Sequence, residues 1–223
     1  MKGCLLIHGF TGAPFEVEPI AKYLEERGYV TLCPTLPGHG KKQRDLKNYS
    51  YKDWIQSSEE AYVKLSKKCD SIIIIGFSMG GLLSFHLIQK YKVNCFISIG
   101  TPIYCFDFKN LYLDIIDQFQ MKNYHRISNY IKSCFTPIYA NLNFKKLLCK
   151  TKYIIPKINA PTLIIHGKKD PIVKYKSASY IYTHIKSKDK EIRFYKEAKH
   201  RIHDENIYQN IYKDIYLFIQ KYS

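Results

Sequence analysis

Apolar residues along the chain follow two alternating patterns. Short runs rich in β-branched residues are typical of strands, and they recur at six places. Segments with apolar residues three or four positions apart, the spacing of an amphipathic helix, separate most of these runs. The predicted strands are 3–8, 29–34, 71–77, 94–100, 161–167 and 191–197, and the predicted helices are 14–27, 52–68, 79–91, 174–186 and 205–222.

The run Ser71–Phe77 contains four consecutive isoleucines and shows no alternation. This pattern predicts a parallel strand that is covered on both faces. Strands that alternate with helices imply βαβ units, so we expect an α/β fold with a mostly parallel sheet of about six strands flanked by helices. The segment 35–50 is rich in turn-forming residues and is predicted to be a loop.

One segment interrupts the alternation. Residues 101–156 are rich in Phe, Leu and Ile and are interpreted as two or more helices without a strand. An insertion between two strands of one sheet would lie over the carboxyl end of the sheet. The sequence therefore predicts a single domain over residues 1–223, with a helical cap inserted at about 102–156, before the last two strands.

Length and cysteine usage favour an intracellular globular protein. The chain has 223 residues, which suits one domain with a sizeable core. No apolar run approaches the roughly 20 residues of a membrane span, and the N-terminal run is shorter than the apolar core of a signal peptide. The seven cysteines form no C-x-x-C pair, so we expect buried free thiols in a reducing, cytoplasmic compartment.

The formal net charge of +16 raises the question of a nucleic-acid partner. Nucleic-acid binders usually concentrate their positive charge in one patch or tail. The lysines here are scattered over most polar segments, so a nucleic-acid partner is not expected. Weak contact with anionic membranes stays open.

The segment Gly76–Gly80 matches the pattern G-x-S-x-G between a predicted strand and a predicted helix. A turn this tight leaves Ser78 in a strained conformation, and the two glycines avoid collisions with neighbouring chain. The Ser78 hydroxyl would then stand beside a helix start, where unpaired N–H groups can stabilise an oxyanion. The alternative is that Ser78 only caps the helix.

A nucleophilic serine needs a base, and the base needs an orienting acid. Asp170 follows one predicted strand and His200 follows the last, and both loops belong to the carboxyl edge of a parallel sheet. The order Ser78, Asp170, His200 is a known order of such triads. His203 is an alternative base and Asp107 an alternative acid.

Four segments of the chain together resemble the α/β-hydrolases, close to the small bacterial carboxylesterases and monoacylglycerol lipases. They are "LLIHGFTG", "PTLPGHG", "GFSMGG" and "PTLIIHGKKDPIV", in the order of that family. The resemblance covers essentially the whole chain and is weakest over 101–156. It implies the α/β-hydrolase fold, a serine hydrolase activity, and neither a metal nor a cofactor.

The resemblance also assigns roles to single residues. The histidine of the family lies 14 residues before an Asp of the closing helix, as His200 does before Asp214, which favours it over His203. The family usually has glycine just before this histidine, where this chain has Lys199. Independently of the resemblance, Asp204 is interpreted from its position as a cap of the last helix.

By the same resemblance, the backbone N–H groups of Phe10 and Met79 form the oxyanion hole. His8 and His39 then have structural roles in their loops, because no metal-binding spacing surrounds them. The expected substrate is a carboxylic ester with an apolar acyl part, of short to medium chain length or monoacylglycerol-like. The alternatives are a thioesterase, an amidase or peptidase, an acyltransferase, or a catalytically silent lipid-binding protein.

Overall fold

The six predicted strands form one sheet in the computed structural model, which describes residues 1–104, 136–200 and 208–223. Within these residues the strand order is β2-β1-β3-β4-β5-β6, and each neighbouring pair is parallel. The expected parallel α/β sheet is thereby confirmed. The strands are β1 (Lys2–Ile7), β2 (Val30–Leu32), β3 (Ser71–Phe77), β4 (Cys95–Ile99), β5 (Thr162–Gly167) and β6 (Lys190–Tyr195).

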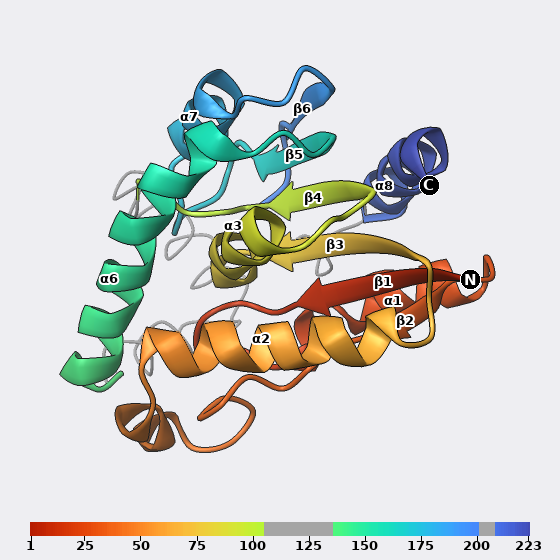
Figure 1. Cartoon of the computed structure of the whole chain (residues 1–223). Helices are drawn as coiled ribbons and strands as arrows, with labels where there is room; N and C mark the ends of the chain where they lie inside the picture. Colours follow the sequence, from red (N-terminus) through yellow and green to blue (C-terminus); the bar gives the residue numbers. More distant parts are fainter. Residues whose placement is uncertain (105–135, 201–207) are drawn as a thin grey trace, which may run out of the picture.

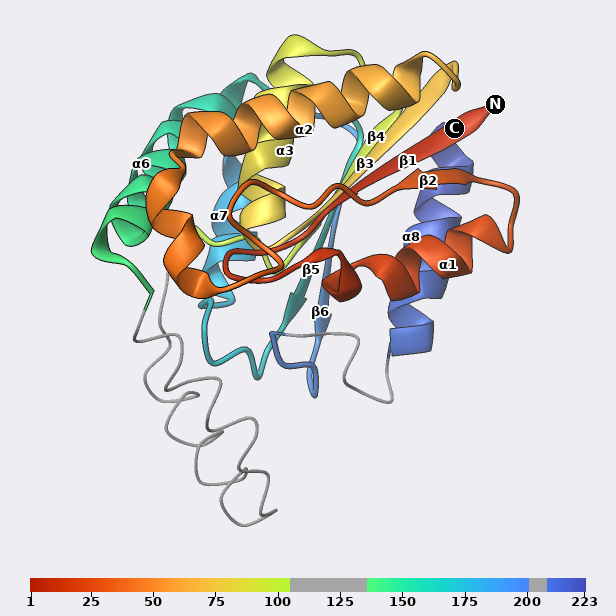
Figure 2. The same cartoon turned by 90° about the horizontal axis from the view of Figure 1, so that it is seen from below.

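Helices cover both faces of the sheet (Figure 1). Those described are α1 (Glu18–Glu25), α2 (Tyr51–Ser66), α3 (Met79–Lys90), α6 (Ile138–Ile154), α7 (Lys176–His184) and α8 (Tyr208–Tyr222). Three 3₁₀ turns, η1 (Pro14–Glu16), η2 (Gln43–Asn48) and η3 (Ile155–Lys157), complete the described helical structure. Helices α2 and α3 lie on one side of the sheet, and α1 and α8 lie on the other (Figure 2).

Strand β3 divides its isoleucines between two cores. Successive side chains of a strand point to opposite faces, and Ile72 and Ile74 accordingly pack toward α2 and α3. Ile73 and Ile75 pack toward α1 and α8. Burying each side chain contributes about 1.5–3 kcal/mol to stability, so the strand that leads into Ser78 is among the best anchored parts of the fold.

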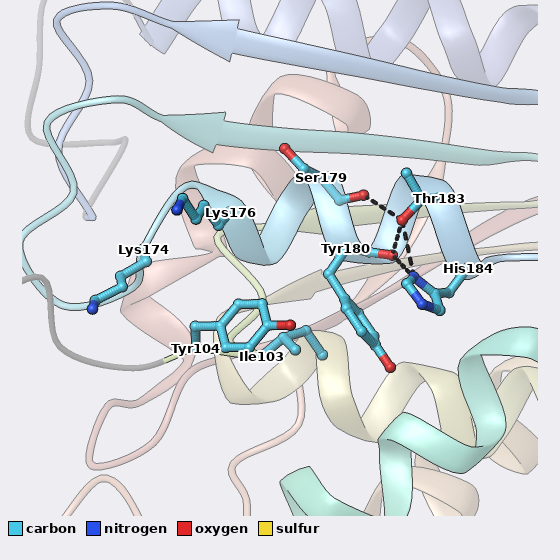
Figure 3. A pocket seen from close by; sticks show the side chains of 8 residues that line it. All are labelled: Ile103, Tyr104, Lys174, Lys176, Ser179, Tyr180, Thr183 and His184. Atoms are coloured by element: carbon cyan, nitrogen blue, oxygen red, sulfur yellow. Dashed lines mark hydrogen bonds between the residues drawn. The ribbon is translucent and has the colours of Figure 1, made fainter.

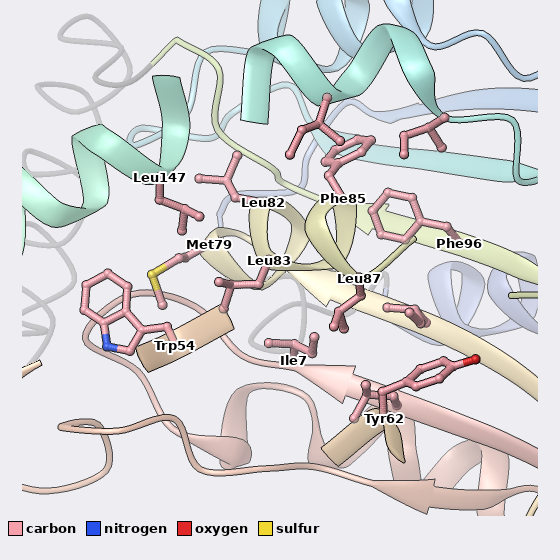
Figure 4. Packing of buried hydrophobic residues seen from close by; sticks show 14 of the residues in the cluster. Ile7, Trp54, Tyr62, Met79, Leu82, Leu83, Phe85, Leu87, Phe96 and Leu147 are labelled. Carbon is pink, nitrogen blue, oxygen red and sulfur yellow. The ribbon is translucent and has the colours of Figure 1, made fainter. Parts of the chain in front are cut away.

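The core beneath α2 and α3 is built largely from aromatic and aliphatic side chains of these two helices and the adjoining strands (Figure 4). Trp54 of α2 and Phe85 of α3 are both fully buried there. Phe85 contacts Phe96 of β4 edge to face, with ring centroids 5.0 Å apart. These contacts hold α3, the helix that begins directly after Ser78, against the sheet.

The first predicted helix, 14–27, is divided in the structure. The turn η1 ends at Glu16, and α1 begins at Glu18. Val17 between them has φ −120°, which departs from helical geometry. Glu16 points inward, and its carboxylate accepts a hydrogen bond from the Gly9 N–H at 3.0 Å. This polar contact explains why the apolar spacing alone predicted a single helix incorrectly.

Most other predicted elements differ from the structure by a few residues at their ends, and two differences have an identifiable feature behind them. The predicted loop 35–50 contains η2. Helix α2 begins at Tyr51, one residue before its predicted start, because Ser50 and Asp53 form a capping box. Asp53 Oδ2 accepts from the Ser50 N–H at 2.6 Å, which satisfies one of the amides that a helix start leaves unpaired.

Helix α6 makes up most of the described part of the predicted insertion. It packs against α3 and α2, and it lies on the side toward which the strand arrows point (Figure 1). Leu147 of α6 is buried in the same core as Trp54 (Figure 4). The rest of the predicted helical insert, 105–135, lies outside the described residues. Among the described helices, none is both long enough and apolar enough to cross a membrane.

Candidate active site

Ser78 occupies a sharp turn between β3 and α3. Its backbone has φ 51° and ψ −118°, and a positive φ is uncommon for a residue other than glycine. Hydrogen bonds hold the turn on both sides, because the Ser78 N–H donates to the Ile99 oxygen at 2.8 Å and the Ser78 oxygen accepts from the Gly81 N–H at 2.9 Å. The side chain makes no capping bond to α3, so the hydroxyl is available for another role.

Gly76 and Gly80 surround this turn at positions where no side chain fits. A Cβ atom on Gly80 would overlap the Ile7 oxygen and lie 2.6 Å from the Ile7 carbonyl carbon. A Cβ atom on Gly76 would lie 2.5 Å from the Gly81 Cα. Since these neighbours are backbone atoms, they cannot move aside without shifting β1 or α3.

Three predicted residues from separate loops meet at the carboxyl edge of the sheet. Ser78 follows β3, Asp170 follows β5 and His200 follows β6. The His200 Nε2 lies 3.1 Å from the Ser78 Oγ, and the His200 Nδ1 lies 2.6 Å from the Asp170 Oδ2. A proton on Nδ1 that is donated to Asp170 leaves Nε2 able to accept the serine proton.

The Asp170 carboxylate is held by more than the histidine. Its Oδ1 accepts from the N–H groups of Ile172 and Val173, both at 2.8 Å, and the residue is 2% exposed. Burial alone would raise the pKa of Asp170, but the attraction and the hydrogen bond of His200 keep that pKa below its usual value. Asp170 therefore stays ionised beside the imidazole.

His166 is a second buried histidine beside Asp170. Its Nε2 donates to the Val173 oxygen at 3.0 Å and lies 3.6 Å from the Asp170 Oδ2. Burial lowers the pKa of His166 below its usual range, which favours the neutral ring. The contact fixes the loop that supplies the Val173 N–H to Asp170. Its place within an apolar strand gave no sign of this role.

The alternatives for base and acid are only partly represented in the structure. His203, Asp107 and Asp204 lie outside the described residues. Among the described histidines, His200 is the one hydrogen-bonded to Ser78. Phe77 lies beside its imidazole, with ring centroids 5.2 Å apart.

The loop after β1, Gly9–Gly12, is called the β1 loop. A Cβ atom on Gly9 would lie 3.2 Å from the Ser78 Cβ, so this loop lies against the serine. Phe10 anchors the loop by stacking its ring on Phe144 of α6, with centroids 5.0 Å apart. Within the described part of the chain, no loop or capping hydrogen bond uses the Phe10 or Met79 N–H.

His8 and His39 both contact the β1 loop, because the His8 ring bonds to Gly9 and the centroid of the His39 ring lies 6.1 Å from that of Phe10. The His8 Nε2 accepts from the Leu36 N–H at 3.2 Å, so its Nδ1 carries the proton and donates to the Gly9 oxygen at 2.8 Å. The His39 Nδ1 lies 3.0 Å from the Pro37 oxygen. Burial lowers the pKa of each histidine to about 4. These contacts agree with the structural roles expected from the sequence.

A separate cavity of about 710 Å³ opens beside α7 (Figure 3). Its lining includes Tyr104, Lys174 and Tyr180, and contains neither Ser78 nor His200.

No cluster of three or more His, Cys, Asp or Glu side chains within residues 1–104, 136–200 and 208–223 is arranged to hold a metal ion. At the Ser78 site, by contrast, a serine hydroxyl, an imidazole and a carboxylate lie within hydrogen-bond distance of one another in sequence.

Comparisons with known proteins agree with this fold. The family model described as alpha/beta hydrolase fold matches residues 5–125, and one described as serine aminopeptidase, S33, matches residues 140–207. A carboxylesterase of Bacillus subtilis (strain 168) is 26% identical over 99% of this chain and 93% of its own length. A thermostable monoacylglycerol lipase of Bacillus sp. (strain H-257) is 32% identical over 85% of this chain and 79% of its own length.

Solved structures show the same architecture. One from work on two metagenome-derived lipolytic enzymes has a TM-score of 0.83 at 21% identity and covers 99% of this chain and 94% of its own. A monoacylglycerol lipase of Paleococcus ferrophilus has a TM-score of 0.76 at 15% identity, covering 99% and 95%. The protein belongs to the alpha/beta hydrolase fold family.

Proposed function

We propose that the protein is a serine hydrolase that cleaves carboxylic esters through an acyl-enzyme on Ser78. The observation that carries this proposal is the continuous contact from the Ser78 Oγ to the His200 Nε2 and from the His200 Nδ1 to Asp170. The relatives named carboxylesterase and monoacylglycerol lipase support the same reaction class.

In the proposed first step, His200 Nε2 accepts the Ser78 proton while Oγ bonds to the ester carbonyl carbon. The resulting imidazolium, stabilised by Asp170, donates that proton to the alcohol oxygen as its bond to carbon breaks. In the second step His200 takes a proton from water, and the hydroxide attacks the acyl-enzyme. The proton returns to Ser78 as the acid leaves, so atoms and charge balance.

The N–H groups of Phe10 and Met79 are proposed to bind the oxyanion of both steps. Met79 is the first residue of α3, so its N–H has no partner within the helix. Phe10 belongs to the β1 loop, which lies against Ser78. By comparison with other oxyanion holes, each donor lowers the barrier by about 2.7–4 kcal/mol.

The proposed substrate is a small-molecule ester with an apolar acyl part, such as a short- to medium-chain ester or a monoacylglycerol. The lipase name of one relative and the apolar composition of the segment 102–156 support this choice.

We also propose how the chain is divided: one domain over residues 1–223, with a cap at about 102–156. The position of α6 supports it.

The chief alternative is an amidase or peptidase, which the serine aminopeptidase match over residues 140–207 favours. A thioesterase or an acyltransferase would use the same three side chains. Rates for aryl esters of increasing acyl length, measured beside matched thioesters and anilides, separate these classes. We expect the highest kcat/KM on an ester, with no activity in Ser78→Ala. A higher kcat/KM on anilides or thioesters would replace the ester proposal.

A catalytically silent lipid-binding protein is the non-enzyme alternative. It predicts strong liposome binding that weakens with salt and survives Ser78→Ala, without ester turnover by the wild type. The enzyme proposal predicts turnover and at most weak contact with anionic membranes through the charge of +16. Neither nucleic acid nor a cofactor has a role in it.

A reducing, cytoplasmic location is proposed from the cysteines. The described cysteines are free, and burial raises the pKa of Cys33 and Cys95 to about 12. Thiols of this kind are unreactive and need no disulfide partner. Cys105 and Cys134 lie outside the described residues.

A further inference from the structure

Glu16 is a buried carboxylate that the proposed catalytic steps do not use. It is 6% exposed, and its Oε2 accepts from the Gly9 N–H at 3.0 Å. A Cβ atom on Gly12 would overlap Oε2 and lie 2.7 Å from Oε1, so the Gly12 backbone also lies against the carboxylate. The β1 loop is thus folded around the Glu16 side chain.

A single residue, Gly9, contacts both the Glu16 carboxylate and the Ser78 side chain. A Cβ atom on Gly9 would lie 3.2 Å from the Glu16 Oε2 and 3.2 Å from the Ser78 Cβ. Gly9 therefore lies against both side chains. Any displacement of the Gly9 backbone changes the position of the β1 loop relative to Ser78.

Hydrogen bonds fix both peptide groups of Gly9. The Gly9 oxygen accepts from the His8 Nδ1 at 2.8 Å and from the Gly12 N–H at 3.3 Å. Because a trans peptide is planar, the Phe10 N–H points opposite to that oxygen. The preceding peptide is held by Glu16 through the Gly9 N–H. The direction of the Phe10 N–H is therefore set by the hydrogen bonds that His8, Gly12 and Glu16 make to Gly9.

We propose that Glu16 is a positioning residue that orients the Phe10 N–H toward the oxyanion by holding the Gly9 N–H. This inference rests on the proposed function, because it needs an oxyanion beside Ser78. Glu16 exchanges no proton or atom with the substrate. Since the oxyanion exists only after attack on the carbonyl, a misplaced donor lowers kcat and leaves KM nearly unchanged.

The test compares Glu16→Gln with Glu16→Met on an aryl ester. Both variants remove the charge and have similar length, but only glutamine can accept from the Gly9 N–H. We expect kcat of Glu16→Met to be at least about tenfold below that of Glu16→Gln, with KM of each within about twofold of the wild type. Inhibition by a trifluoromethyl ketone, which forms an oxyanion adduct, should weaken in parallel with kcat/KM.

Glu18→Met, at an exposed carboxylate two residues further on, is the matched control and should retain wild-type kcat. If Glu16→Met does not fold, Gly12→Ala replaces it, because its Cβ displaces the same carboxylate. Equal kcat in the glutamine and methionine variants, or wild-type kcat in Gly12→Ala when that variant is used, would overturn the inference alone. Absence of wild-type ester turnover would instead overturn the proposed function.

Discussion

The turn at Ser78 is held by backbone atoms, whereas the β1 loop depends on buried side chains in addition to its backbone hydrogen bonds. At the turn, Gly80 lies against the Ile7 carbonyl, and buried isoleucines of β3 fix the strand that leads into it. In the β1 loop, Glu16 and His8 hold the peptides of Gly9 by hydrogen bonds. The two regions together show that rigid positioning can come from steric contact or from buried polar contacts.

Ser78→Ala tests whether the turn depends on the hydroxyl. Because the backbone holds the turn, we expect an unfolding free energy within about 1 kcal/mol of the wild type. Ester turnover should fall by about 10⁶-fold in kcat, as in serine hydrolases that lose their nucleophile. Urea denaturation and steady-state kinetics give the two values. A large loss of stability would show that the side chain also supports the turn.

Gly80→Ala tests the steric contact itself. The new Cβ would overlap the Ile7 carbonyl, so we expect a loss of about 3 kcal/mol or more in the free energy of unfolding. Gly28→Ala is the control, because Gly28 has φ 82° but no neighbour within 4 Å of an added Cβ. That variant should lose only about 1 kcal/mol. A loss at Gly80 no larger than the loss at Gly28 would contradict the steric contact.

His8→Leu tests the polar support of the β1 loop. The substitution leaves the Leu36 N–H without its acceptor and removes one donor to the Gly9 oxygen. We expect a loss of about 2 kcal/mol in stability and a fall of about tenfold in kcat. Thermal unfolding and ester kinetics check both values. Unchanged kcat in the folded variant would separate His8 from the orientation of the Phe10 N–H.

His39→Phe gives the smallest effect at neutral pH and tests the pH dependence of the same region. Burial lowers the folded pKa of His39 to about 4, so the unfolded chain binds a proton more readily as the pH falls below about 6.5. Wild-type stability should therefore decrease on acidification through this window. The variant should lose about 2 kcal/mol less between pH 7 and pH 5, measured by urea denaturation at both values. Equal losses would contradict a buried neutral His39.

The contrast between the Ser78 turn and the β1 loop also explains which parts of the site could be predicted from the sequence. Ser78, Asp170 and His200 follow strands with clear apolar patterns, so their order along the chain predicted that they share one sheet edge. Glu16 sits within an apolar spacing that predicted a continuous helix, and its partner Gly9 leaves no side-chain pattern. The role of Glu16 depends on how the chain folds back from η1 onto the β1 loop. The periodicity of apolar residues along the sequence carries no information about this contact.

Strand positions were likewise predicted better than segment ends. The β-branched run of β3 marks a buried strand wherever it occurs. The start of α2, in contrast, depends on the capping box of Ser50 and Asp53, and the break at Val17 depends on the inward turn of Glu16. Both features are set by individual hydrogen bonds.

The most direct test of the central claim is labelling of the folded protein with a fluorophosphonate, followed by mass mapping of the adduct. A serine activated by His200, whose imidazole is oriented by Asp170, should form one adduct, at Ser78, and His200→Ala should lose it. Circular dichroism of both proteins establishes that the samples are folded. No labelling of the folded wild type, or an adduct at another residue, would contradict the account.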